Sequence, residues 1–136
     1  MGARSKSRKR ALDLLFEADQ RGVNVQALLV ERLARPVTQT PLPEYAVTLV
    51  EGVVRMWAEI NDLLTTYSQG WSVDRMPAVD RAILRLGTWE VVYSDEVPEA
   101  VAISEAVALA KELSTDDSPT FVNGLLARLA EVKHTL

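Results

Sequence analysis

The spacing of the apolar residues is the feature that most constrains what this chain can fold into. From Ser7 nearly to the end of the chain, apolar residues recur every three or four positions, which is the period of one face of an α-helix. No stretch alternates with period two for long enough to form a β-strand. The 136 residues correspond to one domain, and neither half is long enough to bury a core alone. We therefore predict an all-α, single-domain protein of about seven helices.

Start and stop residues divide this pattern into separate helices. Gly22 is a natural end for a first helix that starts near Ser7, and Asn24 is the expected N-cap of a second helix whose inner side carries Leu28, Leu29 and Leu33. Five further elements are predicted: one long helix over 46–67 ended by Gln69-Gly70, a single turn within 71–77, a helix over 77–94, a helix from Pro98 to Leu113, and a last helix capped by Asp117 or Ser118 with Pro119 just inside.

Three glycines lie within these predicted helices, where each costs about 1 kcal/mol relative to alanine. A close approach of two helices is the usual compensation, and we expect it at Gly52 and Gly87. Asn123-Gly124 would indicate a hairpin turn elsewhere. Its apolar neighbours keep the helical spacing, so we expect this pair to continue the last helix.

The composition offers few candidate catalytic residues. The chain has no cysteine, which excludes disulfides, thiolate zinc sites, iron–sulfur clusters and a cysteine nucleophile. Its one histidine, His134, lies two residues from the C-terminus, and no phosphate-binding glycine motif is present. We expect no enzymatic activity, no metal and no cofactor. Without an apolar window long enough for a membrane span or a signal segment, we expect a cytoplasmic protein that does not enter a membrane.

The basic residues are concentrated at one end of the chain. Residues 1–10 hold five Lys or Arg and no acid, whereas the whole chain has a net charge of −4. A basic N-terminal arm leading into the first helix is typical of nucleic-acid contact, although a solubilising tail would look the same. Farther along that helix, Phe16 is either a platform for an unstacked base or a core residue. The candidate phosphate contacts are Arg4, Lys6, Arg8, Lys9 and Arg10.

The start of the last predicted helix offers a second candidate anchor. Asp117-Ser118 would present free backbone N–H groups, and Asn123 follows one turn later. Lys111, near the end of the preceding helix, would complete a patch with them. Each has a structural alternative, because an acid at a helix start and a lysine at a helix end are also favoured by the helix dipole.

Three segments carry a family resemblance, and they cover nearly the whole chain in order: SRKRALDLLFEADQRG, VDRAILRLGTWEVVYSDEVPEAVAISEAVALAKEL and STDDSPTFVNGLLARL. They resemble the bacterial NusB family of transcription antitermination factors, in the form typical of high-GC Gram-positive (actinobacterial) species. The most specific part is AISEAVALAKEL followed by DDSPTFVNG. The resemblance implies an all-helical fold of two small helical bundles. It also implies binding to the single-stranded boxA element of ribosomal RNA leader transcripts, together with the small-subunit ribosomal protein NusE, in an antitermination complex of RNA polymerase.

The resemblance also assigns roles to particular residues. The acidic position that faces the ribosomal protein in the family is matched by Asp80. Ser5 and Ser7 interrupt the basic run, so the resemblance implies a modest affinity for RNA alone. Three RNA-binding elements of the family have counterparts in this chain. The family's arginine-rich start corresponds to Arg8, Lys9 and Arg10, preceded by Arg4 and Lys6, and the aromatic of its first helix corresponds to Phe16. Its Asp-Ser and Phe-Val-Asn-Gly elements correspond to Asp117, Ser118, Phe121, Asn123 and Gly124.

Two other functions are compatible with the same helical module. A related module precedes the catalytic domain of some ribosomal RNA cytosine methyltransferases, but 136 residues leave no room for such a domain, so we do not expect one. The second is a protein-interaction or dimerisation module whose basic segment is incidental. Some family members form homodimers, and the sequence leaves monomer and homodimer open.

Overall fold

The computed structural model describes residues 2–38, 40–69 and 71–135, and within these ranges it contains seven α-helices and no strand. The predicted all-α class is confirmed. No helix in these ranges is long and apolar enough to cross a membrane. The α-helices are α1 (Ala3–Arg21), α2 (Val25–Ala34), α3 (Glu44–Arg55), α4 (Trp57–Tyr67), α5 (Ala78–Thr88), α6 (Glu99–Leu113) and α7 (Ser118–Lys133), with a 3-10 turn η1 (Val73–Arg75) and a π-helical turn η2 (Trp89–Tyr93).

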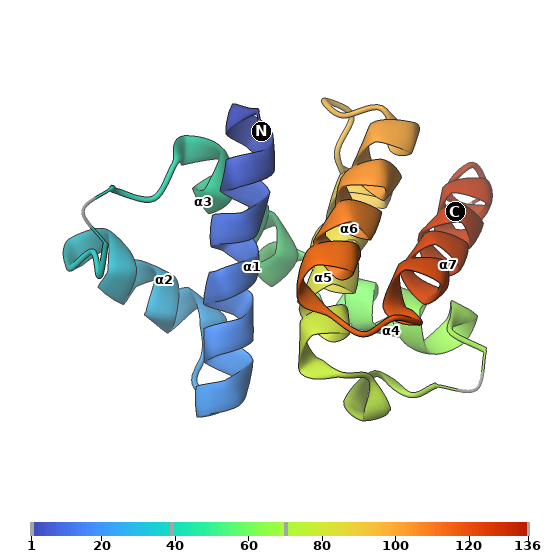
Figure 1. The fold of residues 1–136 in the computed structure, drawn as a ribbon, viewed down its shortest axis with the longest axis horizontal. Helices are drawn as coiled ribbons and strands as arrows, with labels where there is room; N and C mark the ends of the chain where they lie inside the picture. The colour runs from blue at the N-terminus through green and yellow to red at the C-terminus, as the bar shows by residue number, and fades with distance from the viewer. Residues whose placement is uncertain (1, 39, 70, 136) are drawn as a thin grey trace.

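The helices form two groups that share one core. Figure 1 shows α1, α2 and α3 on one side and α4 to α7 on the other, in agreement with the expected two bundles. Helix α5 packs against α6 and α7 but also against α1, and so joins the two groups. The main apolar cluster accordingly runs from Leu15 of α1 through Val53 and Ile83 to Leu126 of α7.

Several predicted boundaries are confirmed by their local geometry. Gly22 ends α1 with φ of 65°, a left-handed conformation that glycine adopts without strain. Asn24 caps α2 by accepting the backbone N–H of Ala27 at 3.0 Å. The turn expected within 71–77 is η1, and Pro119 lies in the first turn of α7.

The prediction of one long helix over 46–67 is wrong. Met56 has φ −104° and ψ 23°, outside the helical region, and it separates α3 from α4. This bend turns the chain from the first group, where α3 packs on α1, to the second, where α4 packs on α7. Val53 and Ile60 on either side are both fully buried, so the apolar period continues through the bend and does not reveal it. The predicted stop at Gln69-Gly70 falls partly outside the described residues, because Gly70 is not among them.

The close approaches expected at two glycines are confirmed. A Cβ on Gly52 would lie 2.2 Å from Cε2 of Trp89, and one on Gly87 would lie 2.7 Å from Cδ1 of Leu126. Asn123-Gly124 continues α7 as predicted. The expected inward position of Leu33 is wrong, since this residue is 51% exposed on α2.

Two helix ends differ from the prediction. The helix expected over 77–94 is α-helical only to Thr88 and continues as the π-helical turn η2. This turn places Glu90 in the interior, where it is 2% exposed. At the start of α7, Asp117 makes no side-chain capping bond. The hydroxyl of Ser118 is bonded to other side chains, so the expected cap at Asp117 or Ser118 is not formed.

Candidate nucleic-acid interface

The basic segment at the start of the chain is helical. Helix α1 begins at Ala3, so Arg4 to Arg10 occupy its first turns, and the expectation of an arm preceding the helix is corrected. A helix directs side chains to all sides of its axis, and these cations therefore lie in different surroundings. Only part of the segment faces solvent.

Arg8 is the clearest departure from the expected solvated segment, because it is only 4% exposed. Its Nε and Nη2 donate to the two carboxylate oxygens of Glu90 at 2.8 and 2.9 Å, and its Nη1 lies 3.3 Å from Glu105. The hydroxyl of Tyr45 donates to the same Glu90 carboxylate at 2.6 Å. Burial and this bond raise the pKa of Tyr45 well above its ordinary value. Arg8 therefore anchors α1 to η2 and α3 and is not free to meet a phosphate.

The other basic side chains of the segment are more accessible. Arg4 lies 4.4 Å above the ring of Tyr45 and 3.5 Å from Glu96. Arg10 donates to the hydroxyl of Thr38 and the carbonyl of Thr40, at 3.1 and 3.0 Å. It thereby holds the connection between α2 and α3.

Lys6 and Lys9 lie on the outward side of α1. Lys9 pairs with Glu112 of α6 at 2.6 Å, and this hydrogen bond raises the pKa of Lys9. Lys6 is exposed and makes no ion pair with any described residue. The spacing of three, four and seven residues places Lys6, Lys9, Asp13 and Phe16 along one side of the helix. We call these four residues the α1 stripe.

Phe16 lies at the edge of the folded core. It is half-buried, but it is not among the hydrophobic side chains that pack against either apolar cluster of the described chain. This position speaks against the core interpretation. A half-exposed aromatic ring two turns beyond Lys9 on the same side of the helix is suited to serve as a stacking platform.

Acidic residues of α6 border the α1 stripe. Glu112 pairs with Lys9, and Glu105 accepts the hydroxyl of Ser5 at 2.5 Å and lies next to Arg8. These bonds hold the first half of α1 beside α6. The sequence reasoning missed Glu90, Glu105 and Glu112, because nothing in the local sequence pairs them with residues about a hundred positions earlier.

Asp80 and Ser118 are buried, which corrects the expectation that they are exposed contacts. Asp80 is 3% exposed and Ser118 is 1% exposed. The Asp80 carboxylate accepts the hydroxyls of Ser114 at 2.5 Å and Ser118 at 2.8 Å. Asp80 therefore fixes the α6–α7 connection to the start of α5 and does not present a charge to a partner protein.

The remaining residues of the second anchor lie at the surface. Lys111, Asp117 and Asn123 are exposed at the end of α6 and in the beginning of α7. Phe121 is half-buried, and its ring centroid lies 5.7 Å from that of Trp71, which is 48% exposed. Sequence reasoning missed Trp71. Its occurrence in a short polar connection was the available signal, since exposed tryptophan is uncommon outside binding surfaces.

The described residues contain no group of three His, Asp or Glu side chains arranged to hold a metal ion. The polar groups of the α1 stripe are Lys6, Lys9 and the Asp13 carboxylate, with Phe16 on the same side of the helix and the paired carboxylates Glu105 and Glu112 of α6 beside it. This combination suits the recognition of phosphates and bases rather than bond-breaking chemistry.

The fold and this surface define a small, two-bundle helical domain of the nucleic-acid-binding class. The family model described as NusB family matches residues 5–131. A transcription antitermination protein NusB from Kineococcus radiotolerans is 61% identical over all of this chain and 98% of its own length. A solved structure of T. maritima NusB is 31% identical, with TM-score 0.81 over 99% of both chains. The structure of antitermination factors NusB and NusE in complex with double-stranded RNA is 30% identical, with TM-score 0.78 over 95% of this chain and 96% of that one.

The chain belongs to the NusB family. Its similarity to actinobacterial members confirms the branch indicated by the sequence. The curated relatives are transcription antitermination proteins, which agrees with the expectation that the chain is not an enzyme.

Proposed function

We propose that this protein is a transcription antitermination factor that binds the boxA element of ribosomal RNA leader transcripts as single-stranded RNA, together with the ribosomal protein NusE. The observation that carries the proposal is the match, over 95% of this chain, to a structure of NusB and NusE in complex with double-stranded RNA, which supports RNA and NusE as partners. The boxA sequence and its single-stranded form follow from the family resemblance. The complex would act within an antitermination assembly of RNA polymerase.

The α1 stripe supplies the primary RNA contacts in this proposal. Lys6 and Lys9 contact phosphates, with Arg4 and Arg10 at the two edges of the same helix. RNA must compete with Glu112 for Lys9 and with Glu96 for Arg4, because both cations already have an anionic partner. This internal competition supports a modest affinity for RNA alone.

The exposed aromatic rings favour single-stranded RNA over duplex RNA as the ligand. Side chains cannot read the deep, narrow major groove of duplex RNA, whereas unpaired bases can stack on exposed rings. Phe16 and the pair formed by Trp71 and Phe121 offer such rings at two places. Among the exposed polar groups near the second place are Lys111 at the end of α6, Asp117 before α7 and Asn123 in its first turns.

Arg8, Asp80 and Ser118 are positioning residues in this account. Arg8 holds α1 against the π-helical turn, so it fixes the direction in which the α1 stripe faces. Asp80 and Ser118 hold the α6–α7 connection, next to which Lys111 and Asn123 lie. Asp80 would influence binding to NusE through the shape of this connection rather than through direct contact.

The test is a fluorescence-anisotropy titration with the boxA RNA of the organism's own ribosomal RNA leader. We expect it to bind more tightly than a scrambled RNA of the same composition, and more tightly than boxA annealed to its complement. Added NusE should increase the affinity. Equal binding of boxA and scrambled RNA with NusE present would contradict the proposal. If light scattering then shows a stable homodimer that excludes RNA, the dimerisation alternative is supported instead.

A further inference from the structure

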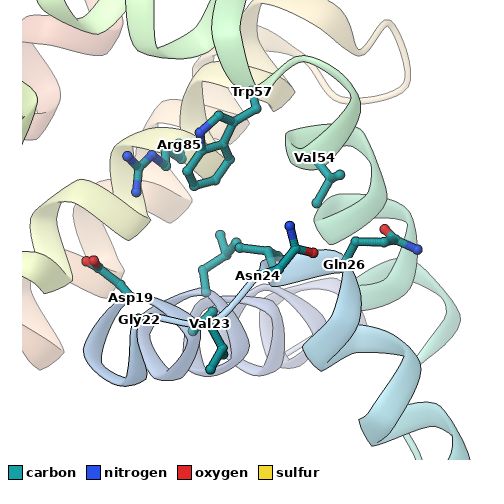
Figure 2. Close-up of a pocket in the computed structure, with 11 residues that line it drawn as sticks. Asp19, Gly22, Val23, Asn24, Gln26, Val54, Trp57 and Arg85 are labelled. Carbon is teal, nitrogen blue, oxygen red and sulfur yellow. The ribbon is translucent and has the colours of Figure 1, made fainter.

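A second concave site lies at the opposite end of α1 from its basic turns. It is a cavity of about 490 Å³ between the end of α1, the start of α2, the α3–α4 bend and α5 (Figure 2). Most of its lining is apolar: Leu15, Ala18, Val23, Val25, Val54 and Trp57. A concave, mostly apolar site with a few polar groups is the usual form of a ligand or peptide pocket.

Arg85 is the one cationic side chain that lines this cavity among the described residues. Its guanidinium lies 4.1 Å from the centre of the Trp57 ring, and its Nε donates to Oδ1 of Asn61 at 3.1 Å. No carboxylate of the described chain lies within ion-pair distance of it, and its two terminal nitrogens have no acceptor in those residues. Burial and the positive charge of Arg81 lower the pKa of Arg85 to about 10.

The neighbouring Arg81, unlike Arg85, has acceptors for its guanidinium nitrogens. It contacts the Asp19 carboxylate at 2.5 Å and donates to the carbonyls of Val73 and Met76 at 3.1 and 3.2 Å. Asp19 also lines the cavity, but its charge is already matched by Arg81. Arg85 is therefore partly removed from water and has no carboxylate within ion-pair distance, since the Asp19 carboxylate is paired with Arg81.

We propose that this cavity binds a peptide segment of a protein partner, through one carboxylate side chain on Arg85 and an adjacent apolar side chain against Trp57 and Val54. A guanidinium with free terminal nitrogens fits a carboxylate in two-point geometry, and arginine and tryptophan are the residues that most often dominate protein interfaces. This site is additional to the proposed RNA function and does not depend on it.

The charge pattern favours a peptide over a nucleic acid. An RNA strand presents a phosphate at every nucleotide and needs several free cations, but the cavity offers one and holds the Asp19 carboxylate beside it. The site also lies away from the basic side chains of the proposed RNA contacts, although Phe16 lies one turn before Asp19 on the same helix. Asp19 is fifteen residues after Arg4 on the same helix, which corresponds to roughly 22 Å along its axis.

The experiment is an NMR titration of the full, ¹⁵N-labelled chain with two tripeptides, acetyl-Leu-Glu-Leu-amide and its isosteric partner acetyl-Leu-Gln-Leu-amide. We expect the Glu peptide to shift the Trp57 indole N–H and the Val23 amide saturably. The Gln peptide should bind about tenfold more weakly, the factor expected for loss of one charge-assisted pair. Equal affinities, or no saturable shift with the Glu peptide, would overturn the proposal.

Two variants and one RNA complete the test. In Arg85→Gln the preference for the Glu peptide should vanish, whereas Arg75→Gln, an equal charge change at an exposed residue of η1 outside the cavity, should keep it. Loss of preference in both variants would overturn the assignment to Arg85. Hexauridylate should leave Trp57 and Val23 unshifted. If it shifts them saturably and the Glu peptide does not, the cavity is part of an RNA path.

Discussion

Arg8 of α1 and Glu90 of η2 form a two-point ion pair in the interior, with side chains 4% and 2% exposed and donor–acceptor distances of 2.8 and 2.9 Å. The pair joins the first turns of the chain to a π-helical turn 82 residues later. A residue that looks from the sequence like part of a solvated basic segment is thus a structural anchor. The RNA-facing role falls to its exposed neighbours.

Removing one member of this pair should destabilise the fold. Arg8→Met leaves the Glu90 charge buried without a cation, so we expect the free energy of unfolding to fall by about 3–5 kcal/mol. The double variant Arg8→Met/Glu90→Gln removes that charge and should recover part of the loss. Urea denaturation measures both. A double variant no more stable than the single one would show that the ion pair is not the cause.

The two glycines with different surroundings give a matched test of helix packing. Gly52→Ala should destabilise by about 1–3 kcal/mol, because the added methyl would overlap the buried ring of Trp89. Gly124→Ala meets no atom within 4 Å and lies inside α7, so we expect a gain of about 1 kcal/mol. Thermal unfolding of the two variants provides the comparison. Shifts in the same direction would contradict the close approach of η2 to α3.

Asp80 and Asp117 should respond differently to the same substitution. Asp80→Asn weakens two buried bonds from serine hydroxyls, and we expect a loss of about 1–3 kcal/mol. Asp117→Asn changes an exposed side chain without a capping bond, so stability should stay within about 0.5 kcal/mol. Chemical denaturation measures both. Asp80→Lys is a poor test of NusE binding, because a buried ammonium would disturb the fold itself.

Asp117→Asn also tests the second RNA anchor. Removing a negative charge near approaching phosphates is worth on the order of 1 kcal/mol at an exposed site, so boxA RNA should bind several-fold more tightly. Asn123→Ala should bind more weakly. Unchanged RNA affinity of both variants at low salt would limit the RNA path to the α1 stripe.

Phe16 should matter more for RNA than for folding. Because it lies outside the apolar clusters, Phe16→Ala should cost less stability than Leu15→Ala, for which about 2–5 kcal/mol is expected at a fully buried site. Loss of a stacking platform should weaken RNA binding by about 1–3 kcal/mol. Anisotropy and denaturation on the same samples separate the two effects. A larger loss of folding free energy than of RNA-binding free energy would show that Phe16 is a core residue.

The sequence predicted the helical class, most helix boundaries and the family, because these depend on local spacing, caps and motif order. The bend at Met56 could not be predicted, since the apolar period continues across it. Nor could the burial of Arg8 and Asp80. Whether a charged side chain faces solvent depends on partners such as Glu90 and Ser118, which are distant in sequence and are brought close only by the fold.

The most direct test of the account is the salt dependence of boxA binding by the variant Lys6→Gln/Lys9→Gln. These residues are the two cations of the α1 stripe, Lys6 exposed and Lys9 half-buried, and each phosphate contact on a single strand contributes a slope of about −0.7 in a log–log plot of affinity against salt. We predict weaker binding, a slope shallower by about 1.4 and only a small fall in unfolding temperature, because the Lys9–Glu112 pair that is lost lies at the surface. A slope and affinity equal to those of the unmodified protein would contradict RNA binding along this face of α1.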